Sequence, residues 1–69
     1  MQLSARNRLK GTITGPTLGE VMAEVTVDIG GGNEIVSAIT RCSVEGLGLR
    51  EGMTVHAIIK STEVILGKE

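Results

Sequence analysis

The sequence contains no phenylalanine, tyrosine or tryptophan, and it has one cysteine and one histidine among its 69 residues. Without aromatic rings, the chain lacks the stacking surfaces with which small barrels hold single-stranded nucleic acids. The lone cysteine, Cys42, excludes an intrachain disulfide, and Cys42 with His56 is too little for a structural zinc site. The core must therefore be built from aliphatic side chains, which bury less area each than aromatic ones.

Long apolar runs and an excess of charge are missing as well. No segment approaches about 18 consecutive apolar residues, so we expect no membrane-spanning helix. Residues 1–5 have no apolar run that could act as an export signal, which favours a cytoplasmic location. Seven basic and eight acidic residues give a net charge of −1, which offers little attraction for a polyanion. We therefore expect neither a nucleic-acid nor a membrane partner.

The chain has the length of one small domain, residues 1–69. In domains of this size, the free energy gained by burying apolar surface is close to the entropy cost of ordering the chain. Disulfides, bound metals and partner subunits are the usual sources of additional stability. Because the composition excludes the first two, the sequence predicts a homo-oligomer.

Alternation of apolar and polar residues predicts β-strands. The clearest case is 21–29, in which five apolar residues recur at every second position. The segment 15–19, which contains Pro16, is expected to be a turn. The glycine run 30–33 is expected to be a hairpin turn, because a phosphate-binding loop would need a helix after it. The five expected strands are 9–14, 21–29, 34–40, 54–60 and 62–66.

The third expected strand, 34–40, is apolar on both faces, so we expect both faces to be covered. A helix of one to two turns is expected next, with Ser43 as its N-cap and Glu45 in its first turn. Val44 and Leu47 form an apolar i, i+3 pair in that helix. Five strands with one short helix between the third and fourth predict an all-β fold, a small five-stranded, partly open barrel of the OB type.

An enzymatic role has little support in the residue types. No set of serine, histidine and carboxylate, or of cysteine and histidine, is brought together by local sequence. His56 lies opposite in phase to Val55 and Ala57, so it is expected to be exposed. Cys42 is expected to be a small packing residue. The sequence predicts a protein that is not an enzyme.

Three clusters combine hydroxyls with cations or with a helix start: Ser4 with Arg6, Thr40 with Ser43, and Lys60 with Ser61. A tetrahedral oxyanion accepts hydrogen bonds from such donors, and two cations balance a dianion. Each cluster also has an ordinary alternative, because N-terminal arms are often solvated and Ser43 could simply cap the helix. The residue types alone leave these alternatives open.

The two ends of the chain carry paired motifs. Residues 4–11 read Ser-Ala-Arg-Asn-x-Leu-x-Gly, and residues 55–64 read Val-x-Ala-x-x-Lys-Ser-Thr-x-Val. In these motifs the chain resembles the molbindin, or molybdenum-pterin-binding, family. The likeness extends over 3–66 and includes the glycine turn and the Ser-Val-Glu-x-Leu-Gly-Leu helix. In molybdate-sensing regulators and transporter ATPases, the domain of this family is found after the rest of the protein in the sequence.

The resemblance implies a cytoplasmic protein that binds molybdate or tungstate for storage and homeostasis. It also implies a barrel that assembles as a hexamer, a trimer of dimers, with anion sites between subunits. An alternative within the same fold is a molybdate-sensing module that acts on a protein partner. Carried over position by position, the resemblance assigns oxyanion binding to Ser4, the backbone N–H of Ala5, Arg6, Thr40, Ser43, Lys60 and Ser61, with Asn7 in support.

The chain departs from the family pattern in two places. Segment 15–18 reads Gly-Pro-Thr-Leu, where members of the family tend to carry apolar and basic residues. Met22 stands where a polar residue, often asparagine, is expected. These changes put in doubt any second class of anion site on the symmetry axis of the oligomer. The family name mentions a pterin, but no residue of this sequence suggests a pterin pocket, so no pterin is predicted.

Overall fold

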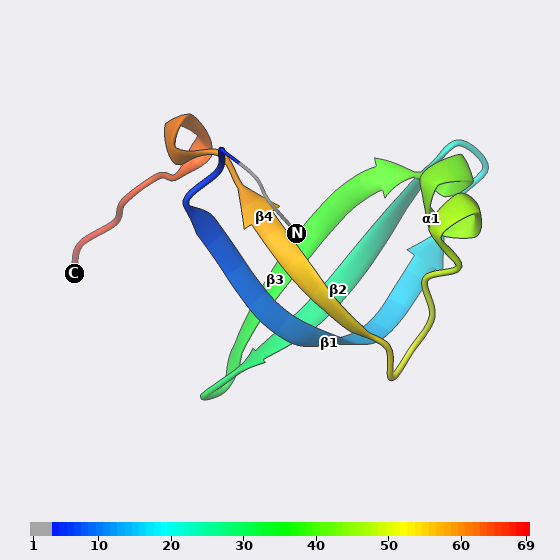
Figure 1. Cartoon of the computed structure of the whole chain (residues 1–69), viewed down its shortest axis with the longest axis horizontal. Helices are drawn as coiled ribbons and strands as arrows, with labels where there is room; N and C mark the ends of the chain where they lie inside the picture. The colour runs from blue at the N-terminus through cyan, green and yellow to red at the C-terminus, as the bar shows by residue number, and fades with distance from the viewer. Residues whose placement is uncertain (1–3) are drawn as a thin grey trace.

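The computed structural model describes residues 4–69 as a curled antiparallel sheet with one short helix (Figure 1). Residues 1–3 lie outside the described residues. The family likeness begins there, at residue 3, and so does the 1–5 segment in which no export signal is expected. The sheet has four strands in the order β3-β2-β1-β4. The elements are β1 (Asn7–Leu18), β2 (Met22–Gly30), β3 (Asn33–Thr40), α1 (Arg41–Leu47), β4 (Thr54–Ile59) and a 3-10 helix (Ser61–Glu63).

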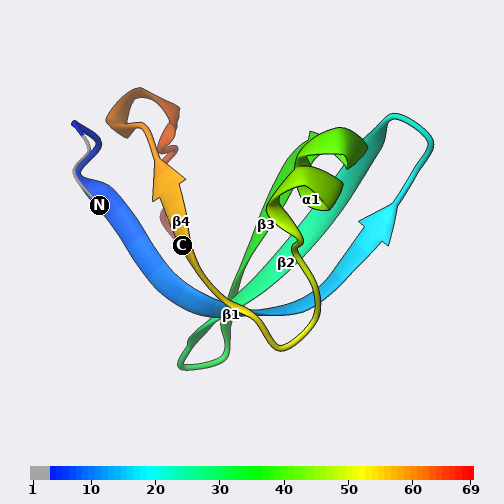
Figure 2. The same ribbon diagram turned by 45° about the vertical axis from the view of Figure 1, so that its right-hand side comes forward.

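The long strand β1 organises the sheet, because it pairs with β4 along its first half and with β2 along its second. Its pairing register with β2 shifts between Ile13 and Gly15. Bulges of this kind bend a strand and increase its twist, and Figure 2 shows β1 curving from β4 to β2. The result is a trough-shaped sheet whose two outer strands, β3 and β4, are not paired with each other.

The turn expected at 15–19 is wrong, because this segment continues β1 as far as Leu18. Pro16 lies opposite Val25 in the β1–β2 ladder. Within the described chain, β4 pairs with β1 only as far as Thr12, so one edge of β1 has no ladder at Pro16. A proline, which cannot donate a backbone hydrogen bond, is tolerated at such an edge. The chain turns later, where the Gly19 N–H donates to the Met22 carbonyl at 2.8 Å.

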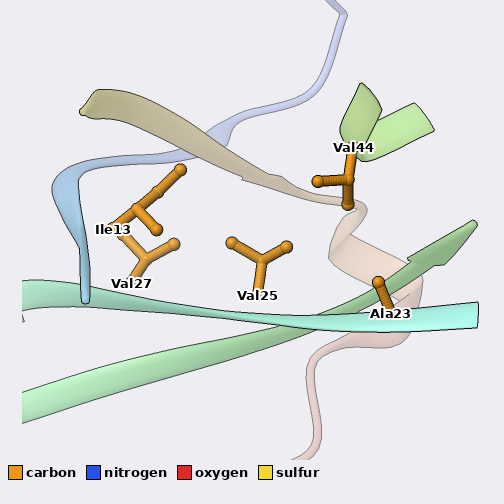
Figure 3. Close-up of a cluster of buried hydrophobic side chains, with 5 residues drawn as sticks. All are labelled: Ile13, Ala23, Val25, Val27 and Val44. Atoms are coloured by element: carbon orange, nitrogen blue, oxygen red, sulfur yellow. The ribbon is translucent and has the colours of Figure 1, made fainter. Parts of the chain in front are cut away.

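The hydrophobic core lies on the concave side of β2. The alternation predicted for this strand is confirmed, because Ala23, Val25 and Val27 are buried and the residues between them face outward or are half-buried. Figure 3 shows these side chains with Ile13 of β1 and Val44 of α1 packed near them. The single helix therefore closes one end of the core with one buried residue, Val44.

Strand β2 lies directly against Gly11 of β1. A Cβ atom at this position would lie 2.5 Å from the Asp28 carbonyl oxygen and 2.6 Å from Cγ1 of Val27. Those distances leave no room for a side chain, so the crossing of the two strands requires glycine here. The predicted hairpin turn after β2 is confirmed: Gly30, Gly31 and Gly32 have positive φ, and the Asp28 carboxylate accepts the Gly30 N–H at 2.8 Å.

The helix begins three residues earlier than the sequence predicted, because Thr40 and not Ser43 is its N-cap. Thr40 ends β3 in an extended conformation, which places its hydroxyl where it accepts the N–H of Ser43. Glu45 therefore lies in the second turn, where it forms an ion pair with Arg41 at 2.8 Å. The helix ends at Gly48, whose φ of 64° is left-handed, as expected of a glycine C-cap.

Three expectations about burial and the last strand are wrong for this chain. Strand β3 is half-buried on one face only, and Val36 on the other face is 58% exposed. Cys42 is exposed and does not pack in the core. Beyond the 3-10 helix, the expected fifth strand, 62–66, is not a strand, and Ile65 and Leu66 are 93% and 90% exposed. A strand forms only beside another strand edge, and the described chain places none next to this segment.

Candidate functional site

The first and third polar clusters come together at one end of the sheet. The antiparallel β1–β4 ladder begins with Asn7 opposite Ile59. The residues just before Asn7 and just after Ile59 must therefore lie at the same end, since antiparallel neighbours run in opposite directions. Figures 1 and 2 show the blue segment that leads into β1 beside the 3-10 helix that follows β4. Pairing of β1 with β4 thus brings Ser4 and Arg6 near Lys60 and Ser61.

This end of the sheet carries two cations on exposed side chains. Ser4, Arg6, Lys60 and Ser61 are exposed, whereas Ala5 and Asn7 are half-buried. Among residues 4–69 the one ion pair is Arg41–Glu45, so neither Arg6 nor Lys60 is neutralised by a carboxylate there. Half-buried Asn7 opens the ladder with β4 opposite Ile59, and its supporting role stays a prediction. A small anion would meet two positive charges and two hydroxyls here.

The Thr40–Ser43 cluster is a preformed hydrogen-bonded pair. The Ser43 N–H donates to Oγ1 of Thr40 at 3.1 Å, and the Thr40 hydroxyl donates to Oγ of Ser43 at 2.8 Å. Each hydroxyl has one proton. With the Thr40 proton used in this contact, the Ser43 proton can be donated to a further acceptor. Both residues are exposed, so that acceptor can come from outside the chain.

The structure does not bring this pair to the other two clusters. Thr40 lies opposite Met22 at the far end of β2, beside the turn that follows Leu18 at the end of β1. Lys60 and Arg6 lie at the opposite end of β1, near Asn7. The molecule measures 35 × 27 × 21 Å, and Figure 1 shows α1 on the side away from the start of β1. The predicted residues of one chain therefore lie in two separate groups, which are called the two half-sites below.

An apolar groove of about 860 Å³ lies along the concave side of the sheet between the two outer strands. Its walls are mainly aliphatic side chains of β2, β3 and β4, and Lys60 and Glu63 lie at its rim. β3 and β4, which supply many of the lining residues, are the outer strands of the sheet and have no strand beyond them among residues 4–69. Lys60 is the one predicted site residue that lines this groove.

Two residues of the Thr40–Ser43 region were not singled out by sequence reasoning as a pair. Arg41 and Glu45 are four positions apart, a spacing that favours ion pairs on a helix. That signal was available, but the helix was expected to begin after Arg41.

His56 is exposed on β4, as expected, and its cross-strand neighbour is Lys10. No group of three or more histidine, cysteine, aspartate and glutamate residues among residues 4–69 could hold a metal ion.

The described part of the chain, 4–69, has no helix with the length and apolar character required to cross a membrane.

Comparisons with known proteins agree on one family. The model of the TOBE domain matches residues 3–66. Molybdenum-pterin-binding protein 1 of Clostridium pasteurianum is 50% identical over 66 residues, which cover 96% of this chain and 97% of the relative. The probable molybdenum-pterin-binding protein of Haemophilus influenzae is 45% identical over 69 residues and all of both chains.

Solved structures show the same fold. MopII of Clostridium pasteurianum superposes with a TM-score of 0.90 at 48% identity, covering 97% of this chain and all of that one. ModG, described as a cytoplasmic molybdate-binding protein and solved with molybdate bound, has a TM-score of 0.91 at 48% identity. The matched region is 97% of this chain and 48% of ModG. The expected all-β class with one short helix is confirmed by these likenesses.

Proposed function

Because the chain belongs to the TOBE-domain family and, within it, to the molybdenum-pterin-binding proteins, we propose that it binds molybdate or tungstate and stores the anion. The observation that carries the proposal is the β1–β4 pairing. It brings the Ser4–Arg6 segment to Lys60 and Ser61 from positions more than fifty residues apart in the sequence.

The residue types at this end suit a tetrahedral dianion. Arg6 and Lys60 supply two positive charges, and the hydroxyls of Ser4 and Ser61 with the backbone N–H of Ala5 supply neutral donors. Hydrogen bonds from charged donors to an anion are roughly twice as strong as neutral ones. Arg6, Lys60 and the Ala5 N–H can only donate, so most contacts of the site favour an anion whose oxygens carry no proton.

The proposed site is completed by a second copy of the chain. Thr40 and Ser43 lie too far from Lys60 within one chain, so a site with all seven predicted residues needs two chains. Two further observations support association. The apolar groove has unpaired strand edges on both sides, and the tail presents Ile65 and Leu66 almost fully to solvent. Burial of these aliphatic side chains against another copy contributes about 1.5–3 kcal/mol each.

We propose that the copies form a homohexamer, a trimer of dimers, with anion sites shared between chains. Storage in the cytoplasm is favoured over the sensing alternative, because matched relatives of similar length are named for binding and ModG is described as cytoplasmic. Although the relatives' names mention a pterin, we propose none for this chain. A pterin ring is held well by aromatic stacking, and the sequence has no aromatic residue.

Isothermal titration calorimetry of the purified protein with sodium molybdate tests the binding proposal. We expect saturable heat at micromolar concentrations, and sodium chloride injected at the same concentration serves as the control. Sedimentation velocity on the same sample tests the assembly, with a species near six times the 7.2 kDa chain mass expected. Absence of saturable heat from a folded sample would overturn the proposed function.

A further inference from the structure

Arg41 connects the start of α1 with the turn between β1 and β2. Its backbone N–H donates to the Val21 carbonyl at 2.7 Å, and its guanidinium donates to the Gly19 carbonyl at 3.4 Å. The Nε atom of the same guanidinium donates to the Glu45 carboxylate at 2.8 Å. Figure 1 shows α1 beside this turn. The position of the guanidinium is thus defined by contacts on both sides.

This cation lies close to the Thr40–Ser43 pair. Arg41 directly follows Thr40, and Ser43 lies between Arg41 and Glu45 in the same seven-residue helix. Residues within one helical turn rise by only about 5.4 Å. An Arg41 charge without a partner would therefore act on any anion held by the Ser43 hydroxyl. Glu45 supplies that partner, and the side chains of Arg41 and Glu45 remain 45% and 62% exposed.

We propose that Glu45 sets the charge of this half-site and so contributes to the choice of anion. By neutralising Arg41, it limits the Thr40–Ser43 half to neutral donors. The completed site then has two uncompensated cations, Arg6 and Lys60, which match a dianion. This inference rests on the proposed function, since it concerns the same shared site. Glu45 and Arg41 are positioning residues here, because neither needs to touch the anion.

The expected size of the effect follows from Coulomb's law. At an assumed separation of about 9 Å, in surroundings close to water, a unit charge changes affinity by about twofold for each negative charge on the anion. The change is therefore about twofold for a monoanion and about four- to fivefold for a dianion at low salt. Salt reduces both, because the separation is close to the Debye length of about 10 Å at 0.1 M.

Perrhenate and molybdate allow this charge effect to be measured. Both are tetrahedral oxyanions with four unprotonated oxygens near neutral pH, but perrhenate carries one negative charge and molybdate two. Calorimetry with each anion at low ionic strength should show tighter binding to Glu45→Gln than to the unchanged protein. The logarithm of the fold-change for molybdate should be about twice that for perrhenate.

Two further variants isolate the cause. Glu34→Gln makes the same change in charge six residues from Thr40 along β3, at the other end of that strand, and should leave both affinities nearly unchanged. The double variant Arg41→Gln/Glu45→Gln should return the molybdate affinity to that of the unchanged protein. Gln keeps the length and helix propensity of Glu, and circular dichroism checks that each variant is folded.

The results separate this inference from the proposed function. Molybdate binding by the unchanged protein, with equal fold-changes for both anions in Glu45→Gln, would show a structural effect and overturn the charge-setting role. Unchanged affinities in Glu45→Gln would overturn it as well. If the unchanged protein bound no molybdate, the proposed function itself would fail.

Discussion

Two variants that each lack one half-site should recover binding when their chains are assembled together. The first variant is Lys60→Ala, which removes one of the two cations at the β1–β4 end. The second is Ser43→Asp, which places a carboxylate where the other half-site offers its available hydroxyl proton. The prediction follows from the separation of the two half-sites at opposite ends of β1.

Each variant alone should bind molybdate poorly. Loss of a hydrogen bond from a charged donor costs about 1.5–3 kcal/mol, which weakens binding by roughly ten- to a hundredfold. In Ser43→Asp, a negative charge about 4 Å from a dianion costs about 2 kcal/mol even in water, and more where water is partly excluded. Stability should change little, because Lys60 and Ser43 are both exposed.

Random assembly of the two variants in equal amounts restores some sites. A shared site is intact when the chain supplying Lys60 is the Ser43→Asp variant and the chain supplying Ser43 is the Lys60→Ala variant. Each condition is met about half of the time in a symmetric oligomer, so about one quarter of the sites should bind with the original affinity. A site built within one chain would contain no intact copy in such a mixture.

The assay is calorimetric titration of molybdate after the two variants are unfolded together in denaturant and refolded. The same variants refolded separately and then mixed just before the titration provide the control. A stoichiometry near one quarter of that of the unchanged protein is expected for the co-refolded sample. No recovery after co-refolding, with mass spectrometry showing mixed oligomers, would refute the sharing of sites between chains.

Three further predictions concern stability, assembly and selectivity. Gly11→Ala should lower the free energy of unfolding by about 2 kcal/mol or more, because the added Cβ overlaps the Asp28 carbonyl. Urea unfolding measures this change. Gly46→Ala is the control, because nothing lies within 4 Å of its added Cβ. Leu66→Asp should produce smaller species in sedimentation, whereas Lys68→Asp should not; equal behaviour would exclude a packed role for the tail. Competition against bound molybdate should rank tungstate first, then sulfate, then phosphate, because the phosphate proton meets a site made mostly of donors, at a cost of up to about 1–3 kcal/mol. Equal displacement by phosphate and tungstate would identify a general anion patch.

Much of the fold could be predicted because its signals are local. The period-two alternation along β2 located the strand and its buried face, and the glycine run located the hairpin. The start of α1 was misjudged because Thr40 and Ser43 both have side chains that cap helices, and only the end of β3 decides between them. Pro16 suggested a turn. It is tolerated inside β1 because β4 stops pairing with β1 at Thr12 and leaves that edge free at Pro16, which the sequence alone does not reveal.

The candidate site was predictable as residue types but not as an arrangement. The hydroxyls and cations at the two chain ends could be named from the sequence, and the β1–β4 register explains why they meet. That Thr40 and Ser43 lie elsewhere depends on the strand order, which no local pattern encodes. The fifth expected strand shows a related limit, because 62–66 has a strand-like sequence but no strand edge beside it in its own chain.

The open groove and exposed tail also have a consequence for how the cell would accumulate the protein. Under the proposed assembly, each newly made chain leaves the groove lining and the Ile65–Leu66 tail in water until it meets another copy. Encounters between chains scale with the square of their concentration, whereas loss of single chains to proteases scales with its first power. Storage capacity should therefore rise more steeply than the rate of synthesis, with a threshold below which chains are degraded before they assemble.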